Sequence, residues 1–462
     1  MVFSSVTFLC MFLPIFLAVY FISKNITYKN TVLVAFSLLF YAWGEPVWVL
    51  AMLLSGLTDY VCGIVIDKYP DPKHKKIAMG ASLVINLGML SLFKYSGFFV
   101  ENLNALWHSH IPVPRFNLPL GISFYTFQTL SYTIDMYKGT IKVQKNFLSF
   151  MCYVSMFPQL VAGPIVRYSD IEGDLIDRKV SVKNFSAGIT RFSVGLAKKV
   201  LLANPAGAAA TMLLSDPAKM TTASAWLGAV LYGFQVYFDF SGYSDMAIGM
   251  GKMVGFKFLE NFNYPYEAKS VTDFWRRWHI SLSTFFRDYV YIPMGGNRRL
   301  QFRNIALVWI LTGFWHGASW NFILWGAYFG ALLLLERYAL RKVLDKIPSI
   351  ISRIYTLFAV VISWGLFYYT DMSAMKQFFK ALLFIDTPLS SFLPESLFLG
   401  RLWLLVALVL ASTSLPRNIF KNLPRLYPKL RFAEPFYASV CIFLSFLMLL
   451  GQTYNPFLYF RF

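Results

Sequence analysis

Long apolar runs, separated by short polar loops, dominate this sequence from its first residues onward. The first four runs cover residues 5–22, 31–43, 47–66 and 77–97. Because the hydrocarbon core of a bilayer is about 30 Å thick, a helix of about 20 apolar residues is the element that crosses it. Only 14% of the residues are charged and 57% are apolar, whereas soluble domains carry roughly 25% charged residues. We therefore predict an all-α, polytopic membrane protein.

Later apolar runs complete the set of predicted spans. They cover residues 119–137, 184–203, 222–250, 304–312, 318–338, 351–369, 399–413 and 434–452. Of these eight runs and the first four, about eleven are predicted to form transmembrane helices. The run at 5–22 has neither a positively charged stretch before it nor a small-residue cleavage site after it, so we expect a retained helix and not a signal peptide. No internal repeat is visible, which disfavours a transporter built from inverted halves.

One segment departs from the pattern of plain spans. FLSFMCYVSMFPQLVAGPIVRYSDI, residues 147–171, is interrupted by Pro158, Gly163 and Pro164. Irregular backbone is tolerated at membrane depth only where protein or a water-filled cavity satisfies its polar groups. We expect a re-entrant or tilted segment here.

The basic residues are spread through the short loops between the apolar runs. The chain has 42 Lys and Arg against 23 Asp and Glu, a net charge of +19. Cytoplasmic loops of membrane proteins collect Lys and Arg, so this excess indicates topology and not nucleic-acid binding. The loop at 68–76 is rich in lysine, whereas the loop at 101–118 is weakly charged. This alternation predicts that loop 68–76 is cytoplasmic and that the N-terminus lies outside.

Two carboxylates interrupt the apolar run at 222–250. Asp239 and Asp245 lie in the stretch VYFDFSGYSDMAIGMGKM, residues 236–253. A carboxylate within a membrane is costly, and it usually faces the bundle interior or an aqueous cavity and finds a partner there. The two residues either line a path for substrate or serve as structural partners of a helix end or an arginine. The sequence favours neither alternative.

A helix is predicted to begin at Ser270, in the stretch SVTDFWRRWHISL. Ser270 followed three residues later by Asp273 matches the capping pattern of a helix start, with Asp in the place of Glu. Asp273 and Arg277 are also spaced to form an ion pair across the first turn. Arg276 and Arg277 could bind a phosphate-rich donor or lipid headgroups.

The same predicted helix carries His279, the first of two histidines that could take part in chemistry. At helical spacing Trp275, His279, Leu282 and Phe286 fall on one side of this helix. A single histidine on an aromatic face is more often a structural residue, so a structural role stays open for His279.

The second histidine stands between two glycines, in Gly313-Phe314-Trp315-His316-Gly317. Glycine at these places implies a tight turn or a close approach of the backbone to a neighbouring group. A histidine inside a membrane segment is by default a candidate functional residue, and its ordinary pKa suits a general base near neutral pH. The alternative is a histidine that only packs between helices.

Patterns for several other catalytic chemistries are missing. The sequence has no Gly-x-Ser-x-Gly elbow, no Walker or GxGxxG loop, and no HExxH or CxxC pair. Cys10, Cys62, Cys152 and Cys441 lie in apolar runs without paired spacing, so we expect small buried side chains and no metal site. Histidines without a nucleophile suit transfer from an activated donor such as a thioester, because the base then needs only to deprotonate the accepting hydroxyl.

Six longer motifs are distributed along the chain. They are PQLVAGPIVRYSDI (158–171), GLAKKVLLAN (195–204), FDFSGYSDMAIGMGKMVGFKFLENFNYPY (238–266), DFWRRWHISLSTFFRDYVYIPMGGNR (273–298), GFWHGASWNFILWG (313–326) and the terminal NPFLYFRF (455–462). With these motifs the sequence resembles the membrane-bound O-acyltransferase (MBOAT) family, and within it the bacterial alginate O-acetyltransferase-like branch. The resemblance covers nearly the whole chain and shows no departure at either histidine.

The resemblance implies a fold and a set of site residues. The expected fold is a ring of transmembrane helices, with re-entrant or interfacial helices, around a central active-site tunnel. One integral-membrane domain over 1–462 is expected, with its catalytic core at about 115–370. His316 is the implied catalytic histidine and His279 a second functional one. The candidate substrate contacts are Trp275, Arg276, Arg277, Trp315, Asp239 and Asp245.

The resemblance also implies a reaction and its partners. The expected reaction moves an acetyl group from cytosolic acetyl-CoA across the bacterial cytoplasmic (inner) membrane, for O-acetylation of an exported polysaccharide such as an alginate-like polymer, cellulose or peptidoglycan. No bound cofactor is expected, and the partners besides acetyl-CoA and the lipid bilayer are the polysaccharide or a periplasmic or surface acetyltransferase protein. Two alternatives stay open. One is a D-alanyl transferase for teichoic acid that uses a carrier-protein thioester, and the other is a proton-coupled transporter subunit.

Overall fold

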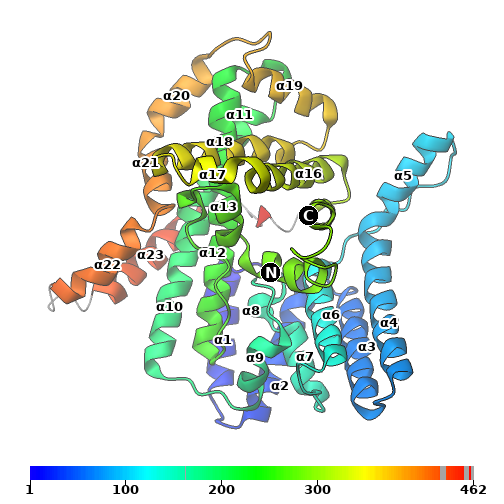
Figure 1. Ribbon diagram of the computed structural model, residues 1–462. Coiled ribbons are helices and arrows are strands. Elements are labelled where there is room, and N and C mark those ends of the chain that lie inside the picture. Colours follow the sequence, from blue (N-terminus) through cyan, green and yellow to red (C-terminus); the bar gives the residue numbers. More distant parts are fainter. Residues whose placement is uncertain (162, 427–432, 452–456, 459–462) are drawn as a thin grey trace. The chain divides into compact units, whose positions relative to one another are not determined.

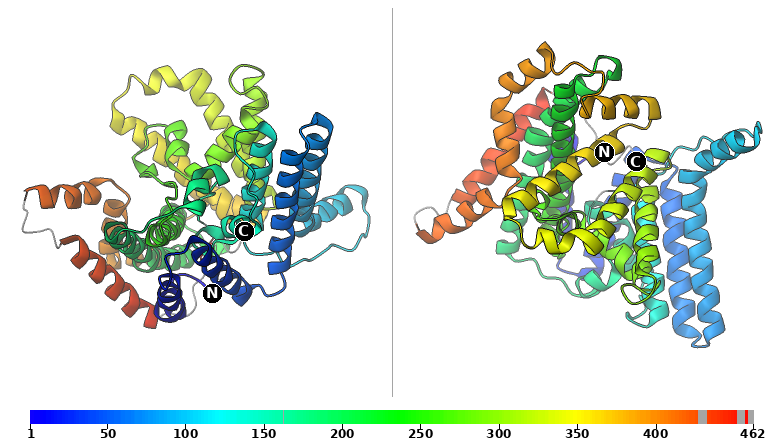
Figure 2. Two further views of the ribbon diagram at one scale, coloured as in Figure 1. Left: turned by 90° about the horizontal axis from the view of Figure 1, so that it is seen from below. Right: turned by 45° about the horizontal axis from the view of Figure 1, so that its top comes forward.

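A computed structural model describes residues 1–161, 163–426, 433–451 and 457–458 of the chain. Every regular element in this described part is a helix, which confirms the predicted all-α class. The helices form two compact units, and Figure 1 and Figure 2 show the individual helices. The first comprises Met1–Phe192 and Tyr243–Leu259, and the second comprises Ser193–Gly242 and Glu260–Leu458. The expected single membrane domain over 1–462 stays a prediction.

The first unit holds the N-terminal helices. They are α1 (Leu13–Tyr20), α2 (Ile26–Gly44), α3 (Val49–Lys68), α4 (Pro72–Leu90), α5 (Ser96–Trp107), α6 (Ile122–Lys138), α7 (Phe147–Ser155), α8 (Phe157–Leu160) and α9 (Tyr168–Ile176), most of α10 (Val182–Ala197) and the end of α12 (Thr222–Val254). Local chemistry sets several helix ends. The Asn25 side chain accepts the Tyr28 N–H at the start of α2, Pro72 opens α4, and Gly139, with a φ of 72°, follows the end of α6. α3 and α4 lie side by side (Figure 1, Figure 2).

A buried polar cluster joins α3, α4 and α6. Asp59 accepts hydrogen bonds from the Ser82 hydroxyl, from the Asn86 amide at 2.7 Å and from the Thr133 hydroxyl at 2.6 Å. A buried polar group is costly unless it is hydrogen-bonded, so these donors hold the carboxylate between three helices. Asp59 carries the same sequence signal as the two predicted carboxylates of the 222–250 run, a carboxylate inside an apolar stretch, and the prediction missed it.

The second unit holds the motif-rich half of the chain. Its helices are α11 (Asn204–Leu214), most of α12, α13 (Val271–Arg277), α14 (Ile280–Phe286), α15 (Gln301–His316), α16 (Trp320–Leu335), α17 (Arg341–Leu344), α18 (Ser349–Tyr368), α19 (Met372–Leu382), α20 (Phe392–Gly400), α21 (Leu402–Ala411), α22 (Leu415–Leu426) and α23 (Ala433–Leu450). Its core is rich in aromatic side chains, and Trp278, Trp325, Trp364 and Phe367 are buried in it.

Among the described residues, five helices are long and apolar enough to cross a membrane, or six if one bent pair is a single span. They are Val49–Lys68, Pro72–Trp107, Trp320–Leu344, Ser349–Tyr368 and Ala433–Leu450, with α20 and α21, bent by 64°, as the pair. The chain is therefore a multi-pass membrane protein. Other expected spans form shorter helices, such as Phe8–Tyr20, or carry charged residues, as α12 does. The count of about eleven spans stays a prediction.

The segment at 147–171 is broken, as predicted. α7 ends at Ser155, and α8, with Pro158 in its first turn, extends only from Phe157 to Leu160. A Cβ atom at Gly163 would lie 2.6 Å from the Cα of Gln159, so the turn after α8 requires glycine. The depth of this segment in the membrane stays a prediction.

The cysteines follow the prediction with one exception. Cys62, Cys152 and Cys441 are buried, but Cys10 is exposed. Phe8 and Phe12, two residues before and after Cys10, face the interior, and the helical turn between them therefore directs Cys10 outward. The expectation of a buried side chain was wrong for Cys10.

Candidate active site

α13 begins at the predicted place. The Ser270 hydroxyl accepts a hydrogen bond from the backbone N–H of Asp273 at 3.0 Å. The carboxylate of Glu336, just after α16, accepts the backbone N–H groups of Val271 and Thr272 at 2.6 and 2.9 Å. A carboxylate there satisfies free N–H groups and lies at the positive end of the helix dipole. α13 is thus tied to the end of α16.

The predicted continuous helix through His279 is wrong, because the chain breaks between α13 and α14. Trp278 is extended, and His279 has a φ of 44°, in the left-handed region. That conformation is unfavourable for a residue with a Cβ atom. A hydrogen bond from the Ile280 N–H to the backbone oxygen of Asn261 at 3.0 Å holds the break in place. The capping pattern predicted the start of the helix correctly, but this break depends on a residue far along the chain.

The side chain of His279 is held by the side chain of the same asparagine. Asn261 Oδ1 lies 3.2 Å from His279 Nδ1, and it also accepts the Ser281 N–H at 3.2 Å and the Ser281 hydroxyl at 2.9 Å. Because a backbone N–H can only donate, this Asn261 atom is the accepting oxygen, and His279 Nδ1 must carry the proton. Nε2 is therefore the ring nitrogen with the lone pair. The ring is 1% exposed, and burial lowers the pKa of His279 to about 3.

His316 is the last residue of α15, and aromatic rings surround it. It is buried, and its ring centroid lies 4.9 Å from that of Trp315, 5.0 Å from that of Trp325 and 5.4 Å from that of Phe367. The next residue, Gly317, is extended, so the helix ends at the histidine.

The glycines that flank His316 allow α15 and α16 to approach closely. A Cβ atom at Gly313 would lie 2.2 Å from the backbone oxygen of Phe322, and one at Gly317 would lie 2.2 Å from the Phe322 ring. Gly326 on α16 faces the backbone of α15 in the same way, because a Cβ atom there would lie 2.3 Å from the oxygen of Trp309. The predicted close approach is confirmed, and the neighbour is α16.

Trp315 contacts both histidines. Its ring centroid lies 6.1 Å from that of His279 and 4.9 Å from that of His316. The structure thus brings the predicted site residues His279, Trp315 and His316 together, although His279 is far from the other two in the sequence. His279 also packs edge-on against Phe240 of α12, with 4.6 Å between ring centroids.

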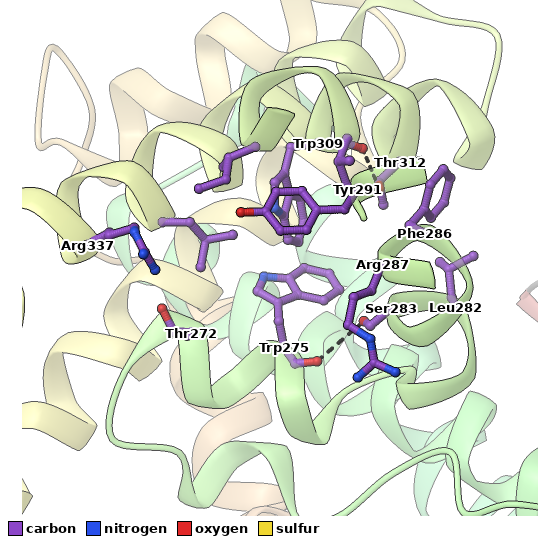
Figure 3. A pocket seen from close by; sticks show the side chains of 13 residues that line it. Thr272, Trp275, Leu282, Ser283, Phe286, Arg287, Tyr291, Trp309, Thr312 and Arg337 are labelled. Atoms are coloured by element: carbon purple, nitrogen blue, oxygen red, sulfur yellow. Dashed lines mark hydrogen bonds between the residues drawn. The ribbon is translucent and has the colours of Figure 1, made fainter. Parts of the chain in front are cut away.

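A pocket of about 250 Å³ lies between α13, α14, α15 and the end of α16 (Figure 3). Trp275, Leu282 and Phe286 line it, so three of the four residues expected on one side do share that side. His279 is absent from the lining, because the chain break turns it the other way. The lining rings of Trp275 and Tyr291 lie near the centre of Figure 3, and Arg337 lies at its left side.

Tryptophans separate this pocket from His316. Trp275 and Trp309 line the pocket and contact each other, with 4.6 Å between ring centroids. Both contact Trp325, at 5.6 and 6.5 Å, and Trp325 contacts His316 at 5.0 Å. Thr312, another lining residue, lies one helical turn before His316 on α15. The pocket therefore ends one aromatic layer away from the histidine.

Comparison with known proteins decides the family. The model of the membrane-bound O-acyltransferase family, MBOAT, matches residues 5–375. The chain belongs to the MBOAT family.

This MBOAT protein is similar to several bacterial enzymes. It is 42% identical over 397 residues to a probable alginate O-acetylase, AlgI, of Azotobacter vinelandii. The matched region covers 83% of this chain and 78% of the relative. The protein is 32% identical over 514 residues to a peptidoglycan O-acetyltransferase of Helicobacter pylori, covering 100% and 98%. It is also 32% identical over 266 residues to a teichoic acid D-alanyltransferase of Bacillus subtilis, covering 53% and 65%. The protein is therefore an O-acyltransferase.

The two arginines expected to bind substrate in this O-acyltransferase do not line the pocket. Arg276 is exposed, and Arg277 Nε pairs with Asp273 Oδ1 at 3.0 Å, as its spacing predicted. The arginines that line the pocket are Arg287 and Arg337. Arg287 Nε and Asp288 Oδ1 pair at 2.6 Å, whereas Arg337 donates from Nε to Gln301 Oε1 at 2.8 Å.

The two carboxylates of α12 both have cationic partners. Lys199 Nζ lies 2.5 Å from Asp239 Oδ1, and both side chains are almost fully buried. Arg191 lies 2.6 Å from Asp245, and a quarter of its side chain is exposed. These contacts fit the structural alternative, while a substrate path along either residue stays a prediction. Of the terminal motif NPFLYFRF only residues 457 and 458 are described, and the Leu458 N–H donates to Asp239 Oδ2 at 2.7 Å.

Several residues of the site were not predicted. Asn261, which sets the tautomer of His279, lies within a motif but in no regular element. Trp309, Trp325 and Arg337 lie on helices whose apolar character hides their individual roles. The only signal that could have pointed to Asn261 was its polar side chain in the connection between α12 and α13, before His279.

Proposed function

We propose that this O-acyltransferase moves an acetyl group from acetyl-CoA to a hydroxyl that serves the O-acetylation of an exported polysaccharide. The support comes from its similarity to an alginate O-acetylase and a peptidoglycan O-acetyltransferase over most or all of the chain. The observation that carries the site is His316, enclosed by aromatic rings one layer away from a pocket. The acceptor of the acetyl group is an exported polymer such as alginate, cellulose or peptidoglycan, or a periplasmic or surface protein that completes the transfer.

In the proposed reaction His316 is the general base. It takes the proton of the accepting hydroxyl, whose oxygen attacks the thioester carbonyl and forms the new C–O bond. The C–S bond then breaks, and the departing thiolate receives a proton as free CoA. A thioester is already activated, so the protein needs mainly to orient the two reactants and to remove the proton.

His279 has a supporting role in this proposal. With Nδ1–H bonded to Asn261, Nε2 can accept a hydrogen bond, but a pKa of about 3 makes the ring a poor holder of a proton. Its contact with Trp315 places it next to the ring that also contacts His316. It orients the site, and His316 carries the proton.

We propose that the slender arm of the donor occupies the aromatic pocket, with its phosphates at Arg337 and its acetyl end directed toward the tryptophan layer that borders His316. Sites for whole drug-sized ligands measure about 300–1,000 Å³, so a pocket of about 250 Å³ suits a slender arm and not a whole nucleotide. No described carboxylate lies within 4.0 Å of Arg337, whereas Arg287 is already paired with Asp288. Arg337 is the lining cation that can best serve an anionic donor.

The matched test compares two arginine variants with purified protein and acetyl-CoA. Arg337→Gln should raise KM for acetyl-CoA by about tenfold, the loss of one charge-assisted contact, with a smaller change in kcat. Arg287→Gln is the control and should change KM little. Equal effects of the two variants on KM would contradict a donor position at Arg337.

D-alanyl transfer from a carrier-protein thioester is the second candidate. It rests on the similarity to a teichoic acid D-alanyltransferase, which covers only 53% of this chain. Supplying purified protein in parallel with acetyl-CoA and with a D-alanyl carrier protein separates the two donors. If turnover occurs with the D-alanyl carrier protein and not with acetyl-CoA, the carrier protein is the donor.

The membrane arrangement is also part of the proposal. We infer about eleven spans in a ring around a central tunnel, with the N-terminus outside and loop 68–76 in the cytoplasm. In a Cys10→Ser background, which removes the exposed native thiol, Pro72→Cys should resist an impermeant thiol reagent in intact cells and His108→Cys should react. The reverse labelling pattern would overturn this orientation.

A further inference from the structure

Two buried cations of the first unit share one tyrosine ring, and no carboxylate among the described residues pairs with either of them. Lys29 on α2 and Arg178, just after α9, are 8% and 6% exposed. Lys29 Nζ lies 5.3 Å and Arg178 Cζ lies 5.7 Å from the centroid of the Tyr20 ring at the end of α1. α1, α2 and α9 lie together in the lower part of Figure 1. Two like charges are therefore held close to one aromatic ring.

A rigid set of hydrogen bonds holds this arrangement. The Tyr20 hydroxyl donates to the backbone oxygen of Val254 at 2.7 Å and accepts from Arg178 Nε at 2.8 Å. Arg178 Nη1 donates to Asn30 Oδ1 at 2.6 Å, and the guanidinium stacks over Phe256 at 4.5 Å. Each bonded partner of Arg178 is neutral, so these contacts fix its position and leave its charge unbalanced.

Nothing among the described residues neutralises the pair. No described carboxylate lies within 4.0 Å of Lys29 or Arg178, and the buried Arg178 Nη2 has no hydrogen-bond partner in the described part of the chain. The nearby Asp174 offers Arg178 only its backbone oxygen, while its carboxylate accepts the Lys257 N–H at 3.2 Å. Buried charges are costly unless they are paired, and an anion between the two cations would remove that cost.

The surroundings indicate what kind of anion fits. Phe21 and Ile22, directly after Tyr20, are 42% and 74% exposed, so apolar side chains flank the site on the surface of a membrane protein. Lys24 lies in the same short connection to α2, and Lys29 stands in the first turns of that helix. Basic pockets between membrane helices bind the headgroups of anionic lipids.

We propose that Lys29 and Arg178, over the ring of Tyr20, bind the phosphate of an anionic phospholipid. Arg178 and Lys29 supply the two positive charges that attract the phosphate, and Phe21 and Ile22 contact the acyl chains. This site lies in the first unit and is independent of the histidines. It makes the enzyme's stability depend on the charge of the surrounding lipid.

The first test counts lipids retained by the full-length, detergent-purified protein in native mass spectrometry. Wild-type protein should retain phosphatidylglycerol in preference to phosphatidylcholine. Lys29→Gln should weaken that preference by about fivefold, the worth of one basic residue at a membrane surface, and Lys29→Arg should keep it. The matched control is Lys179→Gln, which removes one exposed charge beside Arg178 and should leave the preference unchanged. Equal loss in Lys29→Gln and Lys179→Gln would overturn the site.

The second test distinguishes a lipid from a soluble phosphate. The melting temperature of the wild-type protein is measured with phosphatidylglycerol, phosphatidylcholine or inorganic phosphate. Phosphatidylglycerol alone should raise it, and Lys29→Gln should lose that rise. A rise with inorganic phosphate equal to that with phosphatidylglycerol would assign the site to a soluble anion and contradict a lipid site.

Discussion

The surroundings of the two motif histidines differ in kind. His279 lies at a chain break, in a left-handed conformation, with Nδ1 bonded to Asn261 and its ring 1% exposed. His316 lies at the end of a regular helix, and its described ring contacts are with Trp315, Trp325 and Phe367. One histidine is fixed by a polar partner in one tautomer, and the other is enclosed by aromatic rings.

This difference assigns separate roles to two residues that look equivalent in the sequence. A buried ring with a pKa of about 3 is a weak base, so His279 is suited to accept a hydrogen bond and to keep a geometry. His316, beside the tryptophan layer that borders the pocket, is suited to remove the proton of the acceptor. The predictions below, in order of decreasing effect, test this division.

The largest effect is expected from His316→Ala. General-base catalysis typically contributes about 10²–10⁴-fold, and acetyl transfer should fall by that factor because no other base replaces the imidazole. The measurement is transfer from acetyl-CoA to a model acceptor at matched membrane abundance. His279→Gln is the control and should lose less. A larger loss in His279→Gln than in His316→Ala would reverse the assignment of roles.

Asp239→Asn should act on the folded protein and not on the chemistry. It leaves the buried Lys199 unpaired, which costs about 3–5 kcal/mol, so the membrane level of the protein should fall steeply. Asp245→Asn should cost less, because its partner Arg191 is partly exposed to solvent. Protein levels in membranes, measured by immunoblotting, test both. Normal levels of Asp239→Asn with a loss of transfer would instead favour a substrate path at this residue.

The protonation of His279 should make the protein less stable in mild acid. The unfolded histidine binds a proton below about pH 6.5, whereas the folded one stays neutral down to about pH 3, so stability is complete above pH 6.5 and falls as the pH falls. From about pH 7.5 to about pH 5 this residue should cost about 2 kcal/mol. The melting temperature should therefore fall with pH more steeply in wild type than in His279→Phe. The same slope in both proteins would contradict a neutral, buried ring.

The sequence predicted those features that local chemistry determines. The apolar runs predicted a helical multi-pass membrane protein. The pattern Ser270-x-x-Asp273 predicted the N-cap of α13, because a cap depends only on neighbours along the chain. The interrupted run at 147–171 predicted a broken segment, since Pro158, Gly163 and Pro164 disfavour one continuous helix.

Features that depend on distant contacts could not be predicted. The break at His279 exists because Asn261, 18 residues earlier, bonds to it, and helical spacing contains no sign of that partner. The pocket combines Trp275 with Trp309 and Arg337 from helices far along the chain, so its arginines differ from the predicted Arg276 and Arg277. The burial of a cysteine depends in the same way on which side of its helix meets the core, as Cys10 shows.

The most direct test of the central claim is the pH dependence of kcat/KM for acetyl transfer. If His316 holds the proton, its protonation inactivates the free enzyme, and wild type should show a decline in rate on the acid side. His279→Gln should show the same decline at the same pH, with a lower maximum, because His279 does not titrate in that range. His316→Ala should retain only a low rate without that decline. A shift of the decline in His279→Gln, or its persistence in His316→Ala, would contradict the account.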